Sequence, residues 1–214
     1  MNVGLGVYDI FSRIVPGGFY LLVFYQLAIA LGWVKFDPTA LNEIGIVPSI
    51  GLVVLAYILG TGMGRIGSAW HHIFKKRGLS SRVLEKFREE NKDWEFIFKD
   101  KDWPILRAYI RLHNPDIANV IDRNNALSIM LRNISLGLVF LAIAEAIQFV
   151  NTMNWIHVLL VVLFLFFSYQ IAIQARDLQD WFYHGIFQTI IAYRLDLEEW
   201  VKPVKASPKR RNEK

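Results

Sequence analysis

The fold is decided by residues 155–175, WIHVLLVVLFLFFSYQIAIQA, which contain no Asp, Glu, Lys or Arg. A helix of about 20 predominantly apolar residues is long enough to cross a bilayer. Three further apolar runs, at 16–34, 46–63 and 134–150, approach or reach that length. The runs lack the polar face that a helix of a soluble bundle shows to water. A membrane protein is therefore favoured over a soluble helical bundle, in agreement with a mean hydropathy of +0.30.

Positive charge is concentrated in two parts of the chain. Residues 65–132 hold fourteen Lys and Arg against nine acids, and residues 176–214 hold eight against six. The connections at 35–46 and 151–154 together hold a single cation. Since short loops rich in Lys and Arg stay on the cytoplasmic side, we expect both termini and residues 65–132 in the cytoplasm. The membrane is then the plasma (inner) membrane, with little protein on its far side.

These observations predict an all-α integral membrane protein whose four transmembrane helices form two hairpins. We expect four segments: an N-terminal interfacial helix with the first hairpin (1–66), a cytoplasmic helical region (67–130), the second hairpin (131–175), and a cytoplasmic amphipathic helix with a basic tail (176–214). The 67–130 region is barely large enough for a core of its own. We expect it to pack on the membrane surface or on copies of itself. The amphipathic helix either lies along the interface or packs on that region.

The residues before the first span allow two interpretations. Val7, Ile10, Phe11 and Ile14 recur at helical spacing. They indicate a short interfacial helix that ends at Pro16, where the chain turns into the membrane. Alternatively, residues 7–15 simply extend the first span inward.

Small residues follow one another at four-residue spacing along the second span, at Gly60, Gly64 and Ser68. Small side chains at this period let a neighbouring membrane helix approach closely. The neighbour is either another helix of the same chain or a second copy. We expect the protein to be a homo-oligomer.

Glu145 is the one acid well inside an apolar run, and Gln148 lies one turn further on. Ionisable groups within a membrane are costly, and they usually face the interior of a bundle or water. His157, near the start of the fourth run, is a candidate partner. These three residues predict a pore-lining group or a polar latch. The alternative is that Glu145 lies near enough to the interface to reach water.

A layer of polar residues is expected at the cytoplasmic ends of the spans. Its members are charged or titratable side chains next to the apolar runs: Asp9, Arg13, Arg65, Arg123, Arg132, Asp177, Asp180 and His184. Arginines at span ends extend toward lipid phosphates, and ion pairs within the layer can tie the bundle together. A structural role is the favoured interpretation. The alternative is a small anion site or a gate at the mouth of a pore.

Several chemistries find no support in the sequence. The chain contains no cysteine, which excludes disulfides, thiol catalysis and cysteine-bound metals. Adjacent histidines such as His71 and His72 point to different sides of a helix, so no metal site is predicted. No catalytic motif or cofactor fingerprint stands out, and we expect no enzyme activity and no cofactor. Acids interrupt the basic residues of 65–132, so nucleic-acid binding is not indicated.

The stretches YDIFSRIVPGGFYLL (8–22) and VIDRNNALSIMLRN (120–133) each lead directly into an apolar run. With the overall layout, they resemble the small four-span membrane proteins of bacterial anti-phage defence systems, such as the Kiwa membrane subunit. The resemblance implies a membrane sensor or effector that changes membrane integrity on infection and works with a cytoplasmic protein partner. It carries no functional residues over to this chain.

The leading hypothesis is therefore an oligomeric plasma-membrane sensor or effector that senses or perturbs the membrane. Its partners would be membrane lipids, attracted to the basic tail, and a cytoplasmic protein. The alternative is a transporter or scaffold subunit without pore activity. A membrane enzyme that uses His72, Asp180 and His184 is a weaker third possibility.

Overall fold

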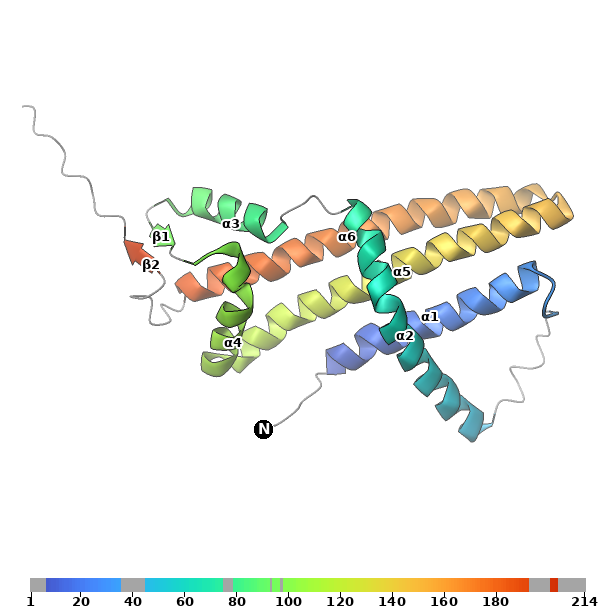
Figure 1. Cartoon of the computed structure of the whole chain (residues 1–214), viewed down its shortest axis with the longest axis horizontal. Coiled ribbons are helices and arrows are strands. Elements are labelled where there is room, and N and C mark those ends of the chain that lie inside the picture. Colours follow the sequence, from blue (N-terminus) through green and yellow to red (C-terminus); the bar gives the residue numbers. More distant parts are fainter. Residues whose placement is uncertain are drawn as a thin grey trace, which may run out of the picture. The chain divides into compact units, whose positions relative to one another are not determined.

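The computed structural model describes residues 7–35, 45–74, 79–92, 94–96, 98–192 and 201–203 (Figure 1). Its contacts divide the chain into two compact units. Unit 1 comprises the described residues of Met1–Lys76 and Asp122–Gln179. Unit 2 comprises those of Arg77–Ile121 and Asp180–Lys214.

Four long helices form most of the described chain: α1 (Val7–Ala30), α2 (Ile46–Phe74), α5 (Pro115–Thr152) and α6 (Trp155–Ala192). Each contains an apolar segment long enough to cross a membrane. In α2 and α6, only 11% of the most apolar window is buried within the protein. Apolar side chains exposed over such a length mark contact with a membrane. The prediction of a helical, multi-pass membrane protein is confirmed.

α1 runs without a break from Val7 to Ala30, although Pro16 lies inside it. A proline within a helix removes one backbone hydrogen bond and commonly ends or kinks the helix. Pro16 is fully buried here, as is Tyr20 one turn later. Of the two interpretations of residues 7–15, the structure shows the continuous helix.

α1 and α2 cross where both helices carry a glycine (Figure 1). A Cβ atom on Gly17 would overlap the backbone carbonyl of Ala56, and one on Gly60 would overlap that of Arg13. Small residues permit this close approach of two backbones in membrane helices. Gly60 thus packs against a helix of the same chain. A Cβ atom on Gly64 would meet nothing within 4 Å, so Gly64 takes no part in this contact.

α5 and α6 lie side by side within unit 1 (Figure 1). Hydrogen bonds from serine side chains join them. Ser135 Oγ donates to the carbonyl of Ser168 at 2.8 Å, and Ser168 Oγ donates to the carbonyl of Ser135 at 2.8 Å. Ser128 Oγ donates to the carbonyl of Ala175 at 2.7 Å. The short connection between the two helices includes Met153, whose φ of 53° is uncommon for a residue with a side chain.

Unit 2 is built from short elements and from the ends of α5 and α6. The short elements are α3 (Leu79–Glu90), β1 (Trp94–Phe96), the 3-10 helix η1 (Asp100–Asp102), α4 (Trp103–His113) and β2 (Val201–Pro203). β1 pairs antiparallel with β2, with Glu95 opposite Lys202. This three-residue pair departs from the all-helical expectation. Its two strands are about 100 residues apart in sequence, so no local sequence pattern predicts the pairing.

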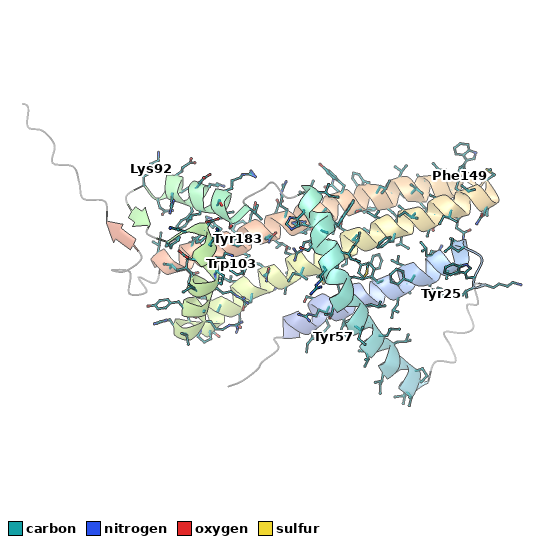
Figure 2. The ribbon with its side chains drawn as sticks, in the orientation of Figure 1. Tyr25, Tyr57, Lys92, Trp103, Phe149 and Tyr183 are labelled. Atoms are coloured by element: carbon teal, nitrogen blue, oxygen red, sulfur yellow. The ribbon has the colours of Figure 1, made fainter. Side chains whose placement is uncertain are left out.

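The core of unit 2 is rich in aromatic side chains contributed by several elements. The rings of Phe98 and Phe187 stack with their centroids 5.5 Å apart. Trp103 of α4 meets Tyr183 of α6 edge-on at 5.8 Å (Figure 2). Ile186 of α6 is fully buried in the same cluster. The end of α6 therefore packs on the 67–130 region and supplies core that this region lacks by itself.

The α1–α2 crossing can be tested with Gly60→Ala, and Gly64→Ala is its matched control. Alanine favours a helix over glycine by about 1 kcal/mol at either position. At position 60, the new methyl group overlaps the Arg13 carbonyl. We expect Gly60→Ala to lower the free energy of unfolding by about 1–3 kcal/mol and Gly64→Ala to leave it equal or higher. Unfolding in detergent micelles followed by circular dichroism measures both. Equal effects of the two variants would contradict the crossing.

Candidate functional site

Glu145 is the only acidic side chain inside the apolar segments of the described residues, and it is buried. It lies on α5 two turns before the end of that helix, and 6% of its surface is exposed. Its neighbours Ala142 and Ala144 are also buried. Because a carboxylate in an apolar interior is costly, its oxygens need partners within the protein. The burial of Glu145 therefore argues against the alternative that its carboxylate reaches water.

Each carboxylate oxygen of Glu145 has a partner on a different helix. His157 Nδ1, on the first turn of α6, lies 2.6 Å from Glu145 Oε2. Gln26 Nε2, near the end of α1, donates to Glu145 Oε1 at 3.2 Å. We call Gln26, Glu145 and His157 the Glu145 cluster. It joins three helices through one side chain.

A second bond ties the same helix ends together. Asn151 Nδ2, in the last turn of α5, donates to the carbonyl of Ala30 at the end of α1 at 2.9 Å. The carbonyls of a helix's last turn have no partner within the helix, and this side chain supplies one. The backbone carbonyl of Gln148 accepts a hydrogen bond from Thr152 Oγ1 at 2.8 Å. The structure thus brings Glu145 and His157 together and adds Gln26, whereas the side chain of Gln148 stays outside these bonds.

The Glu145 cluster can hold and release a proton. An ionised carboxylate accepts both bonds, and the imidazole donates through Nδ1 in either of two forms, as the cation or as the neutral tautomer protonated there. Hydrogen bonds to a charged group are about twice as strong as neutral ones. Removing one partner from a buried charged pair strands the other charge in an apolar interior. The cluster is therefore able to hold the three helices together and to respond strongly to its charge state.

A second polar layer crosses unit 1 nearer the middle of α5. Trp70 Nε1 of α2 donates to Ser135 Oγ at 3.1 Å, and Ser135 is bonded in turn to Ser168. We call Trp70, Ser135 and Ser168 the serine layer. Close by on α5, Asn133 accepts a 2.8 Å hydrogen bond from the hydroxyl of Tyr20 at its carbonyl. The sequence does not predict this layer, because single serines within apolar runs form no distinctive pattern, although they are common contacts between membrane helices.

The predicted rim residues are distributed over both units. Arg13 Nη1 lies 3.5 Å from the hydroxyl of Tyr57, and the guanidinium carbon is 5.9 Å from the centre of that ring, a cation–π arrangement (Figure 2). Asp177 pairs with its neighbour Arg176 at 3.1 Å. The side chain of Asp9 lies outside the described residues. Among the described contacts, the side chain of Arg13 thus interacts with a tyrosine of α2.

The remaining rim residues differ in burial and in the unit to which they belong. Arg65 and Arg123 are exposed, and Arg132 is half-buried. Asp180 and His184 belong to unit 2, where His184 meets the ring of Phe87 edge-on at 5.7 Å. A single polar rim joining all eight residues stays a prediction. Ser68, predicted to serve helix packing, is half-buried on α2. Gly67 beside it is closely packed, since a Cβ atom there would overlap the side chain of Asn133.

No group of three or more His, Asp or Glu side chains suited to a metal ion occurs among the described residues. This observation concerns only the part of the chain that the structure describes.

The strength of the Glu145 cluster is measurable in the unfolding equilibrium. Glu145→Ala removes the acceptor of both Gln26 and His157, so we expect the free energy of unfolding to fall by about 3–5 kcal/mol. Gln148→Ala, one turn away on the same helix, should change it by less than about 1 kcal/mol. Titration with sodium dodecyl sulfate in mild detergent, followed by circular dichroism, compares the two. Similar small effects for both variants would show that the cluster contributes little.

Comparisons with known proteins give no relative from which these residues could be interpreted. No protein-family model, no curated protein and no solved structure matches this chain.

Proposed function

We propose that this protein is a bacterial plasma-membrane sensor or effector that senses or perturbs the membrane, with the Glu145 cluster as the latch of its closed state. The observation that carries the proposal is a buried carboxylate bonded to side chains from two other helices. A well-packed apolar side chain would stabilise a bundle as well as, or better than, a buried charged pair. An ionisable residue inside a membrane therefore indicates a functional site.

Opening of the latch would expose a path of polar side chains through unit 1. When its bonds break, Gln26, Glu145 and His157 present polar atoms between α1 and the α5–α6 pair. The serine layer provides further hydroxyl groups toward the middle of unit 1. Polar side chains at two levels of one bundle supply the partners that water or an ion needs inside a bilayer. Gln148 is the next polar side chain along α5 and stays a candidate for the same path.

Unit 2 is proposed as the cytoplasmic part that receives the signal. Its core contains Ile121 of α5 and Phe187 of α6. The same two helices carry Glu145 and His157. A protein partner or small ligand that rearranges unit 2 would therefore act on the helices that form the latch. The resemblance to anti-phage defence proteins supports infection as the trigger and a homo-oligomer as the working assembly.

Ion leakage from liposomes tests the proposal. The wild-type protein should be closed without a trigger. Loss of about 3 kcal/mol of latch energy shifts a closed–open equilibrium about 100-fold, so Glu145→Ala should raise potassium efflux by a comparable factor. The control is Gln174→Ala, which removes an exposed amide of α6 away from the latch. If Glu145→Ala behaves as wild type and neither leaks under any trigger tried, the pore version is wrong.

A scaffold or transporter subunit without pore activity is the second candidate. It is favoured by the separate core of unit 2, because a unit with its own core can present a surface to a protein partner. This candidate predicts a stable complex with another protein and an unchanged membrane potential on overexpression. The weaker enzyme hypothesis requires His72, Asp180 and His184, and it is removed if their alanine variants keep the cellular phenotype.

A further inference from the structure

We infer that the Glu145 cluster is a proton-binding site and that protonation there releases the C-terminal end of α1 from α5 and α6. The inference rests on the proposed latch and names the ligand that operates it. It requires no ion flux, because it concerns where α1 lies. Its evidence is the way in which α1 is held along its length.

α1 is buried along one stripe. Five of its buried residues recur three, four or seven positions apart and so share one helix face: Ser12, Pro16, Tyr20, Val23 and Ala30. The opposite side carries exposed residues such as Tyr25. α1 is thus attached through this face and through Gly17, which packs on α2, and these contacts decide whether it stays attached.

The described contacts at the N-terminal half of α1 include no acid–base pair, and the side chain of Asp9 lies outside them. Gly17 meets the backbone of Ala56 directly. The Tyr20 hydroxyl donates a hydrogen bond to the backbone carbonyl of Asn133 at 2.8 Å. Neither contact changes when a carboxylate gains a proton. This half of α1 should therefore keep its place over the pH range in which carboxylates and imidazoles titrate.

The attachment at the C-terminal half depends on Glu145. Gln26 donates to one carboxylate oxygen, and the Ala30 carbonyl accepts from Asn151. Addition of a proton to the Glu145 carboxylate forms an O–H bond, removes the negative charge and uses one of the acceptor sites. The bond from Gln26 then loses its charge assistance. Of the two described hydrogen bonds at this end of the helix, only the Asn151 bond keeps its full strength.

The same proton changes the energy of His157. While Glu145 is ionised, a protonated imidazole 2.6 Å away has a counter-charge. After Glu145 is neutralised, an imidazolium at His157, whose side chain is 21% exposed, loses its counter-charge, and further access to water stabilises it. Separation of α1 from the α5–α6 pair gives water that access. Acid thus weakens the bond to Gln26 and favours hydration of His157, and both effects release α1.

No other described charge competes at this position. On α1, Tyr25 is exposed, and Lys35 follows the helix and is exposed. On α5, Arg132 lies 13 residues before Glu145, which is about 20 Å along a helix. On α6, the next titratable group is Tyr169, about 18 Å from His157 by the same rise. Asp37 and Glu43 lie outside the described residues. Among the described residues, Glu145 and His157 are therefore the two ionisable side chains of this site.

The absence of cysteine makes a direct test possible, because introduced cysteines are the only sites for a thiol-reactive label. Spin labels on Leu31→Cys and Met153→Cys report the distance between the end of α1 and the α5–α6 connection by pulsed electron paramagnetic resonance in lipid nanodiscs. Both positions are exposed. A second pair, Val15→Cys and Ile66→Cys, reports the N-terminal half of α1 against α2 and is the matched control.

We expect one short distance for the Leu31–Met153 pair at neutral pH and a longer population that rises about tenfold in acid, as loss of a charge-assisted bond predicts. Glu145→Gln should show the longer population at both pH values. Gln26→Leu, which leaves the Glu145–His157 bond intact, should do the same and serves if Glu145→Gln does not fold. The Val15–Ile66 distance should not change.

The inference is overturned if the Leu31–Met153 distance is the same at both pH values, or if both pairs lengthen together, which would indicate general unfolding. Leakage from the Glu145→Ala variant without any change in this distance would keep the proposed pore and exclude the proton-operated release. A pH-dependent distance without leakage would keep the release and exclude the pore.

Discussion

The structure depends on one constraint: a polar group inside hydrocarbon must find its partner within the protein. Unit 1 meets this constraint with bonds that cross from helix to helix. The serine hydroxyls of α5 and α6 donate to each other's carbonyls, and the Trp70 indole donates to Ser135. Because water is absent, these few contacts fix which helix faces meet. Apolar packing alone distinguishes such faces poorly, since lipid tails are as apolar as the side chains they replace.

The two polar levels of unit 1 satisfy this constraint in different ways. The serine layer consists of neutral groups, which are paired with backbone carbonyls and, for Trp70, with the Ser135 hydroxyl. The Glu145 cluster places a carboxylate at the centre, so the strength of its bonds depends on one proton. We propose that, for this reason, one end of the bundle moves while the other end stays assembled, and that the protein works as a switch.

The sequence predicts the parts of the structure that depend on local composition. Four apolar runs indicate four membrane helices, and an acid inside a run with a histidine at the start of the next suggests that Glu145 and His157 meet. The amide of Gln26 inside an apolar run indicates an interhelical hydrogen bond, but its partner, 119 positions away on another helix, is not evident from the sequence. The roles of Gly17 and Gly60 depend on where two helices cross, which spacing alone does not locate. Completion of the unit 2 core by Phe187, and the pairing of β1 with β2, likewise arise from residues far apart in the chain.

The core of unit 2 is discontinuous in sequence, and this has a consequence for biosynthesis. Residues 79–121 leave the ribosome first, but the aromatic side chains at Phe182 and Phe187 are made only after the apolar segments of α5 and α6. The early residues therefore cannot bury their core until both later membrane segments exist. Assembly of this unit therefore requires synthesis of the whole membrane region, and a chain truncated before the end of α6 exposes apolar surface and is prone to aggregate.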